Sequence, residues 1–443
     1  MQNLPKGSKK LLNAWAFYDW ANSVYSLVIA SAIFPIFYGM LFSLHGSDYI
    51  DLNGITFKST ALISFVTAFA FLTVAILSPI LSGIADFTGS KKGFMQFFCW
   101  FGALCTMGLY WFSLENIYFS LFLYYGGLIG FWGSLVFYNS YLPDIAFTEQ
   151  QDAVSAKGYS MGYIGSVLLM LVNLVMVMKP DFFGIQEATP QLAAQKGMRI
   201  AFITVGVWWI VFAQYSFKYL PVFASKGKVT KNVVWSGVTE LKKVWKSLQH
   251  TPVLKKYLVA FFVYSMAVQT VMLVATYFGE QEIAWANDEQ KTVGLIVSIL
   301  LIQIVAVVGA VLTAKLSAKV GNVKALIFIN TIWLVICLVA YWVTLPVHFY
   351  ITAAFVGLVM GGIQSLSRST YSKFLPDTQD TTSFFSFYDV TEKVGIVIGM
   401  LIYGAIDQIT GSMRNAIVFL MVFFAVGIYL LLRVKKWQKA NNY

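Results

Sequence analysis

The chain has 443 residues, of which 58% are hydrophobic and only 12% are charged. Soluble domains carry about twice that charged fraction, so the composition excludes an ordinary soluble protein. The formal net charge of +11 would suit a nucleic-acid partner, but the basic residues cluster between apolar runs that are long enough to span a bilayer. The alternating segments of about ten residues that build a transmembrane barrel are absent. We predict a helical multi-pass membrane protein without a nucleic-acid partner.

Twelve apolar stretches follow one another along the chain, and each is long enough to cross a membrane as a helix. They lie near residues 12–42, 59–84, 94–113, 117–140, 156–178, 199–220, 257–279, 291–314, 324–344, 348–370, 384–406 and 414–434. The first stretch is too long for the core of a signal peptide, so we expect it to be retained as a span. An even number of spans places both termini on one side.

The basic residues indicate which side that is. All but six of the 31 lysine and arginine residues lie on the faces that hold the termini; the exceptions are Lys58, Lys179, Lys196, Arg199, Lys291 and Arg414. Because basic loops stay on the cytoplasmic side, we predict that both termini are cytoplasmic. We expect a protein of the cell (inner or plasma) membrane.

A long polar stretch divides the chain into two halves. We predict an N-terminal six-helix bundle over 1–220, a basic cytoplasmic connector over 221–256 and a C-terminal six-helix bundle over 257–443. Each half has a similar signature after its fourth span, YLPD from Tyr141 and FLPD from Phe374. The predicted fold is therefore all-α, with twelve transmembrane helices in two pseudo-symmetric six-helix bundles.

The loop after the second span, SGIADFTGSKKGF, predicts a conformational latch made of Asp86, Gly89, Lys91 and Lys92. The glycine permits a tight turn between two helices, and the carboxylate can bond with a neighbouring helix terminus or a basic side chain. Such a latch would hold one conformation and release in the other; the alternative is a plain turn with a solvated aspartate. The corresponding loop of the second half has Ala318 in the aspartate's place, so we predict a latch on one side only.

A carboxylate lies inside the first span, at Asp19. A charge in hydrocarbon costs at least about 2.5 kcal/mol at mid-span, so this side chain is expected to face other helices or a wet cavity. Asp19, Asn22 and Ser26 share one helix face, since their spacing is i, i+3 and i+7. The stripe predicts contact with substrate or a coupled proton, and the alternative is a structural ion pair near the end of the span.

The eleventh span contains three charged residues, Asp389, Glu392 and Lys393. Lys393 is a candidate to bind a substrate carboxylate, and Glu392 or Asp389 to exchange a proton. The alternative is a neutralised network of ion pairs. Gln269 of the seventh span is a secondary candidate for the same cavity.

Further polar residues lie in the fourth and tenth spans. Asn139 and Gln364 are candidate substrate contacts within the membrane. Arg368 lies nearer the cytoplasmic edge and is predicted to act as a gate residue or as an anchor, with Asp377 as a possible partner. Asp144 and Asp377 follow prolines at cytoplasmic turns, where we expect them to cap a helix or form an ion pair.

Several segments resemble a known family. The loop SGIADFTGSKKGF is similar to the major-facilitator signature GxLADxxGRK, although Ser82, Phe87 and Ser90 depart from it. The segments FYDWANSVYSL, FYNSYLPDIAF, GGIQSLSRSTYSKFLP and FFSFYDVTEKVGIVIG look like the vacuole-effluxer branch of that superfamily, as a bacterial-type member. The resemblance covers the whole chain and implies alternating access, with export of amino acids as the activity of the fungal members.

We expect a proton-coupled secondary transporter that moves an amino acid or a similar small zwitterion, with export favoured. The alternatives are a proton-driven importer of a sugar, peptide or cell-wall fragment, or a lipid-handling or non-transporting membrane protein on the same fold. The sequence has no Walker A loop, no metal-ligand spacing and no nucleophile–base pair at membrane depth, so we predict neither an enzyme nor a cofactor. The expected partners are a small-molecule substrate, protons and the lipid bilayer, with the chain as a monomer.

Overall fold

The computed structural model describes residues 4–225 and 233–440 and is almost entirely helical. The first half contains α1 (Lys9–Val24), the π-helical segment η1 (Tyr25–Ile33), α2 (Phe34–His45), α3 (Ser59–Thr88), α4 (Lys91–Gly108), η2 (Leu109–Trp111), α5 (Ile117–Ser140), α6 (Leu142–Ile145), α7 (Gln151–Met178), η3 (Pro180–Phe183) and α8 (Pro190–Tyr219). The second half contains α9 (Val233–Gln249), α10 (Pro252–Glu282), α11 (Asp288–Val320), α12 (Asn322–Ala340), α13 (Pro346–Lys373), α14 (Thr381–Thr410) and α15 (Met413–Ala440).

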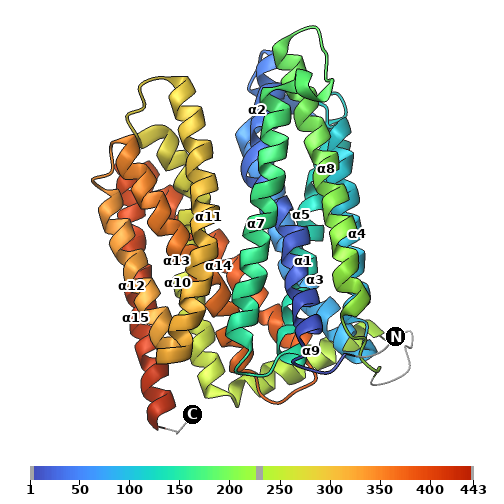
Figure 1. Cartoon of the computed structure of the whole chain (residues 1–443), viewed down its shortest axis with the longest axis vertical. Helices are drawn as coiled ribbons and strands as arrows, with labels where there is room; N and C mark the ends of the chain where they lie inside the picture. Colours follow the sequence, from blue (N-terminus) through green and yellow to red (C-terminus); the bar gives the residue numbers. More distant parts are fainter. Residues whose placement is uncertain (1–3, 226–232, 441–443) are drawn as a thin grey trace.

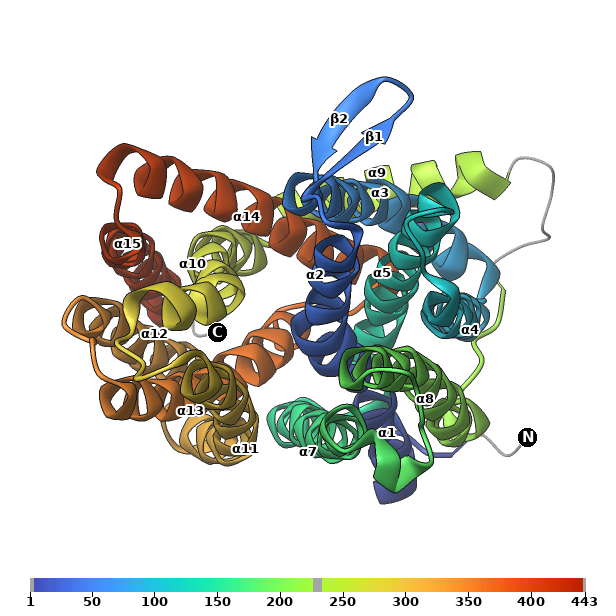
Figure 2. The same cartoon turned by 90° about the horizontal axis from the view of Figure 1, so that it is seen from above.

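The long helices form two bundles that stand side by side (Figures 1 and 2). Helices α1 to α8 surround one apolar core, which includes Trp15, Phe34 and Trp209. Helices α10 to α15 surround a second core, which includes Tyr257 and Trp333. Both termini lie at the same end of the molecule, called the termini end below (Figure 1). The side of the membrane that this end faces stays a prediction.

Eleven helical segments among the described residues are long and apolar enough to cross a membrane. The remaining predicted span, the eleventh, is α14, which has 30 residues but carries Asp389, Glu392 and Lys393 in its middle. It packs against α10 and α15 of its own bundle and against α3 and α5 of the other. Because protein surrounds its charged face on both sides, α14 can run through the membrane without presenting those charges to lipid.

The first span is one continuous helical rod from α1 through η1 to α2. Pro35, at the second position of α2, has no N–H to donate, and the turns that precede it widen into the π-helical segment. The rod starts at Lys9, three residues earlier than predicted, so Asp19 lies ten residues into it. Ten residues correspond to about 15 Å along a helix, which is deeper than the sequence suggested.

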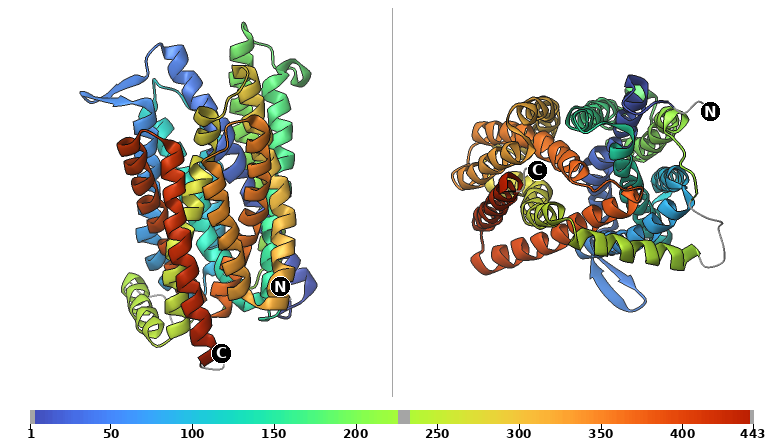
Figure 3. Two further views of the ribbon diagram at one scale, coloured as in Figure 1. Left: turned by 90° about the vertical axis from the view of Figure 1, so that its left-hand side faces the viewer. Right: turned by 90° about the horizontal axis from the view of Figure 1, so that it is seen from below.

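A short hairpin that was not predicted follows the first span. Strands β1 (Tyr49–Leu52) and β2 (Ile55–Lys58) pair antiparallel at the end opposite the termini (Figure 3). Their turn is Asn53–Gly54, and both residues have positive φ, 55° and 83°. An Asn–Gly pair is the preferred dipeptide of a type I′ hairpin turn, so these two residues were the signal that the sequence offered.

The predicted connector over 221–256 contains a helix, α9. It lies across the termini end against α3, α10 and α14, with Val244 and Leu248 buried and Lys242 and Lys246 exposed (Figure 3). Helix α10 begins at Pro252, earlier than predicted. Residues 226–232 of the connector lie outside the described residues.

Candidate functional site

The hydrogen bonds and ion pairs that join the two bundles gather in the half of the molecule near the termini end. Helix α7 of the first bundle meets α11 and α13 of the second, and α14 of the second bundle meets α3 and α5 of the first (Figure 2). Four polar groups lie along these two contact lines: an arginine cluster, a charged cluster on α14 and two latches. They place the structure in a state that is closed at the termini end.

The arginine cluster joins the bundles through Arg368 of α13. Its Nη1 and Nη2 atoms lie 3.4 and 3.3 Å from Oδ2 of Asp19 on α1. It also donates to Oδ1 of Asn139 at 3.1 Å and to the hydroxyl and backbone oxygens of Ser155, both at 3.0 Å. Arg368 is only 1% exposed, so this is a buried ion pair with most of its donors satisfied. Asp19, Asn139 and Arg368 therefore meet, and Asp377 is not the arginine's partner.

Aromatic rings surround the same guanidinium. Its central carbon lies 4.2 Å from the ring centre of Tyr159, 4.7 Å from that of Trp15 and 5.5 Å from that of Tyr138. The hydroxyl of Tyr138 donates to Oδ2 of Asp19 at 2.7 Å. The cation thus has a carboxylate on one side and π faces around it, which is a favourable desolvated setting.

The rest of the predicted polar stripe has a different environment. Asn22 is buried, and its Nδ2 has no hydrogen-bond partner among the described residues. Ser26, one turn further from the termini end, is exposed. Gln364 lies on the contact line with α7, where its Oε1 accepts from the Tyr163 hydroxyl at 2.6 Å. The stripe therefore runs from the buried arginine cluster toward an accessible surface.

The charged cluster on α14 consists of Asp389, Glu392 and Lys393. Lys393 is 1% exposed; it forms an ion pair with Asp389 one turn earlier, and its Nζ lies 3.6 Å from Oε2 of Glu392. Glu392 accepts from Nε2 of Gln269 at 2.7 Å, and Lys393 lies 3.9 Å from the ring centre of Trp132 on α5. These residues combine two carboxylates with one ammonium group at the contact between the bundles.

Two carboxylates of this cluster are in a position to change their bonding partners. Oδ2 of Asp389 is buried and has no hydrogen-bond partner among the described residues. Glu392 is more accessible, with 18% of its side chain exposed.

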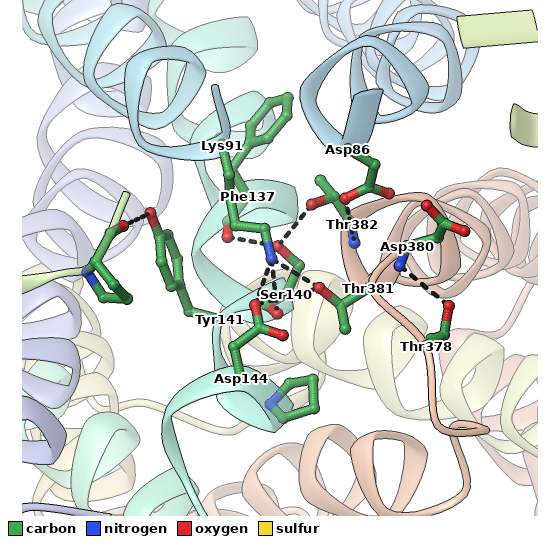
Figure 4. Close-up of polar contacts among 12 residues, drawn as sticks. Asp86, Lys91, Phe137, Ser140, Tyr141, Asp144, Thr378, Asp380, Thr381 and Thr382 are labelled. Atoms are coloured by element: carbon green, nitrogen blue, oxygen red, sulfur yellow. Dashed lines mark hydrogen bonds and ion pairs between the residues drawn. The ribbon is translucent and has the colours of Figure 1, made fainter. Parts of the chain in front are cut away.

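The first latch, defined as Asp86, Lys91, Asp144 and the first turn of α14, contains two of the predicted latch residues, Asp86 and Lys91 (Figure 4). Asp86 accepts hydrogen bonds from the backbone N–H groups of Thr382 at 3.2 Å and Ser383 at 2.7 Å. A carboxylate at a helix N-terminus binds otherwise unpaired amides and interacts favourably with the helix dipole. The carboxylate thus joins the α3–α4 turn of one bundle to a helix of the other.

Lys91 fills the centre of the first latch. Its Nζ lies 2.6 Å from Oδ2 of Asp144 and donates to the Thr381 hydroxyl at 2.7 Å (Figure 4). Gly89 ends α3 with φ of 68°, and a Cβ there would lie 2.4 Å from the backbone oxygen of Phe223. Lys92 points away from α14 and donates to the backbone oxygen of Leu220 at 3.0 Å.

A second latch lies at the corresponding place of the other half, and the prediction of a latch on one side only is wrong. It consists of Asp152, Ser317, Asn322 and Lys373. Oδ2 of Asp152 accepts from Ser317 and Lys373 at 2.8 and 2.7 Å, and Oδ1 accepts from Asn322 at 2.8 Å. The loop between α11 and α12 has no aspartate because the carboxylate comes from the facing helix, α7.

Sequence reasoning missed several residues that take part in these contacts: Asp152, Ser155, Tyr159, Asn322 and Lys373. For Asp152 a signal was present, since an acidic residue in the first turn of a membrane helix suits the helix dipole. For the others, the sequence does not say which helix faces which. Asp144 pairs with Lys91, whereas Asp377, expected to cap or pair, is exposed in the loop between α13 and α14.

Comparison with known proteins bears on the whole chain. The family model described as "Vacuole effluxer Atg22 like" matches residues 7–442. The chain is 29% identical over 420 residues to the uncharacterized MFS-type transporter YxiO of Bacillus subtilis, which covers 95% of this chain and 93% of the relative. It is 23% identical over 478 residues to autophagy-related protein 22 of Kluyveromyces lactis, with 96% and 93% covered.

Solved structures show the same fold. The Escherichia coli fucose:proton symporter FucP superposes with a TM-score of 0.65 over 96% of this chain and 97% of its own, at 15% identity. A bacterial homologue of the iron transporter ferroportin, in an outward-facing state, gives 0.64 over 96% and 98%, at 11% identity. The predicted all-α fold of two helical bundles is confirmed.

Proposed function

Because the chain belongs to the vacuole effluxer Atg22-like family of MFS-type transporters, and is thus a multi-pass membrane transporter and not an enzyme, we propose a specific activity for it. It exports amino acids, or similar small zwitterions, across the cell membrane, and this transport is coupled to protons. The termini end faces the cytoplasm, in line with the distribution of basic residues.

The observation that carries this proposal is the charge balance of the α14 cluster. Two carboxylates and one ammonium group are held between the bundles at Asp389, Glu392 and Lys393. Fully ionised, the cluster has one negative charge in excess, which is costly in an apolar setting. One proton removes that excess, so the cluster suits a coupled proton better than a balanced ion pair does.

The same groups offer a reason for a link between proton binding and substrate binding. A zwitterion brings a carboxylate that Lys393 can bind in place of Asp389. Asp389, released from its ion pair and with Oδ2 already unpartnered, is then the group that accepts a proton. Glu392, the more accessible carboxylate, lies beside Lys393 and provides the route by which that proton enters the cluster.

Alternating access follows from the placement of the clusters. The bonds between the bundles lie near the termini end, so opening this end requires both latches and the Asp19–Arg368 pair to separate. A ligand shifts such an equilibrium only by binding one state more tightly than the other. Substrate and proton bound between the bundles are in a position to do so.

The test is transport by the purified protein in liposomes under an imposed pH gradient. Labelled amino acids are followed together with internal pH, reported by a trapped dye. Gradient-dependent accumulation with matching proton flux is expected. Amino-acid accumulation without proton movement would contradict coupling, and no amino-acid movement by folded protein would contradict the substrate class.

A matched pair of variants assigns the proton. Glu392→Gln is expected to lose gradient-driven accumulation but to keep exchange of labelled for unlabelled amino acid, because exchange needs no net proton movement. Glu280→Gln alters an exposed glutamate of α10 and serves as the control. Normal accumulation by Glu392→Gln would remove this residue from the proton route.

A further inference from the structure

The hydrogen-bond partners and aromatic rings described above for the guanidinium of Arg368 belong to the other bundle. Asp19 and Trp15 lie on α1, Tyr138 on α5 and Tyr159 on α7, and these four residues are called the cage below. Arg368 comes from α13 of the second bundle. The cage and its cation therefore part whenever the bundles separate at the termini end.

The cage has the chemistry that recognises an organic cation. Three aromatic rings have their centres 4.2 to 5.5 Å from the guanidinium carbon, and one carboxylate completes the site. Aromatic faces combined with a carboxylate bind ammonium and guanidinium groups by cation–π attraction and ion pairing. In this structure the cation that fills the site is a side chain of the protein itself.

Contacts within the first bundle hold the cage together without Arg368. Nε1 of Trp15 donates to the backbone oxygen of Tyr138 at 2.9 Å, and the two rings stack with centres 4.5 Å apart. The Tyr138 hydroxyl donates to Asp19 at 2.7 Å. Gly158 lets α7 approach α1 closely, since a Cβ at this position would lie 2.4 Å from Oδ2 of Asp19. Trp15, Tyr138 and Asp19 are thus held in place by contacts of the first bundle alone, and we expect this part of the cage to keep its arrangement when the bundles separate.

Separation leaves the carboxylate of Asp19 among aromatic side chains without its cation. An unpaired charge in such surroundings is costly, so a replacement cation is strongly favoured. We propose that the cage binds the protonated amino group of the substrate when the termini end is open, and that Arg368 displaces that group when this end closes. The proposal rests on the proposed function and deepens it. It requires a cationic amino group on every substrate, and that group enters the cage from the termini end.

The inference separates two kinds of small molecule. An amine that lacks a carboxylate should still occupy the cage, whereas an N-acylated amino acid, which has a carboxylate but no cation, should not. n-Butylammonium and N-acetylalanine are the probes. Neither has to be transported, so the measurement does not depend on the identity of the substrate.

The experiment measures protection of a reporter thiol. Ser155→Cys places a thiol beside Arg368, since the Ser155 hydroxyl accepts from Nε of that arginine at 3.0 Å. In an Arg368→Gln background the competing cation is absent, and n-butylammonium is expected to slow alkylation of the thiol, whereas N-acetylalanine should not. Adding Asp19→Asn should abolish protection. Trp15→Leu should raise the half-protecting concentration about fivefold to tenfold, by loss of a cation–π contact.

The outcomes decide the proposal without reference to transport. A chain that retains Arg368 but is opened by Asp152→Ala should need at least about tenfold more n-butylammonium, because Arg368 competes for the cage. Trp111→Leu, which removes an exposed tryptophan elsewhere, is the control. Absence of protection in folded Arg368→Gln protein, or protection that Asp19→Asn leaves intact, would overturn the proposal. Protection without amino-acid transport in liposomes would overturn the proposed function and leave the cage standing.

Discussion

The two latches occupy equivalent places in the two halves but are built from different parts. In the first latch, the Asp86 carboxylate binds backbone N–H groups of α14, and the ion pair Lys91–Asp144 stays inside one bundle but bonds the Thr381 hydroxyl of α14. In the second latch, the ion pair Asp152–Lys373 itself crosses between the bundles.

The difference shows what the internal repeat preserves. Each latch joins the turn between the second and third helices of one half to the N-terminus of the fifth helix of the other half, α14 in one case and α7 in the other. The carboxylate lies in the turn in the first latch and on the helix in the second. The contact is thus repeated, while the residue that supplies the charge is not.

The two designs should fail differently when they are altered. The α14 amides are backbone groups, so the first latch depends on Asp86 for both of its bonds to backbone N–H groups, while Lys91 and Asp144 add bonds to the Thr381 hydroxyl. The second latch uses side chains on both sides and has more positions at which it can be weakened. A reporter thiol at Ser365→Cys measures opening, because Ser365 is buried and its backbone oxygen accepts from Ser155 of the other bundle.

Loss of both carboxylates should have the largest effect. Hydrogen bonds to charged groups contribute about 1.5–3 kcal/mol each, so Asp86→Ala with Asp152→Ala is expected to speed alkylation of the Ser365→Cys thiol by at least about 200-fold. Cys99, Cys105 and Cys337 are buried, and the chain without the reporter gives the background rate. If the latches act independently, the effects multiply; a double variant no faster than the faster single one would show that they are one unit.

The single substitution Asp152→Ala should come next, with alkylation about 30-fold faster. It removes three hydrogen bonds and leaves Lys373 without its carboxylate, a loss of roughly 2 kcal/mol. Asp152→Asn keeps a side chain for Ser317 and Asn322 but not the ion pair, and is expected to fall between Ala and the parent. Glu149→Ala, at an exposed glutamate nearby, is the control. A parent-like rate in Asp152→Ala would mean that the second latch does not hold the closed state.

The second latch also marks the limit of sequence reasoning. Span positions, the two halves, the charged span and the Asp86 turn follow from apolar length, the repeated LPD signature and spacing, because these are local properties. Which helices face each other is a non-local property, so the sequence could identify Asp19 as a charge that avoids lipid and Arg368 as a gate residue or anchor, but not that the two are partners. In the sequence, Ala318 stands at the position in the second half that corresponds to Asp86. In the structure, the carboxylate of the second latch comes from Asp152 on α7.

The aromatic side chains illustrate the same limit. Thirteen tryptophans and 24 tyrosines occur in the chain, and a single sequence gives no reason to prefer one of them. Trp15 and Tyr159 become notable only because α1, α7 and α13 bring them around one guanidinium. Packing between helices decides this, and packing is not encoded by any one segment.

Asp86→Asn should have a smaller effect than Asp152→Ala. An amide side chain keeps one acceptor oxygen, so one of the two N–H groups at Thr382 and Ser383 stays bonded and the other loses its partner. We expect alkylation of the Ser365→Cys thiol about fivefold faster than in the parent, and a further increase in Asp86→Ala. Equal rates for the Asn and Ala variants would show that the charge of Asp86, and not the number of its acceptor oxygens, holds α14.

Salt should give the smallest effect and the sharpest contrast between the latches. Lys373 has 19% of its side chain exposed and Lys91 only 4%, so mobile ions reach the ion pair of the second latch more readily. Raising the salt concentration from about 0.05 to about 0.5 M shortens the screening length about threefold. This change should speed alkylation of the Ser365→Cys thiol about twofold. Asp152→Asn removes the crossing ion pair and should remove the salt response with it. A salt response that persists in Asp152→Asn would mean that the screened charges lie outside the second latch. Loss of the response would show that the second latch is held by an ion pair that mobile ions reach, and the first by a carboxylate bound to backbone amides.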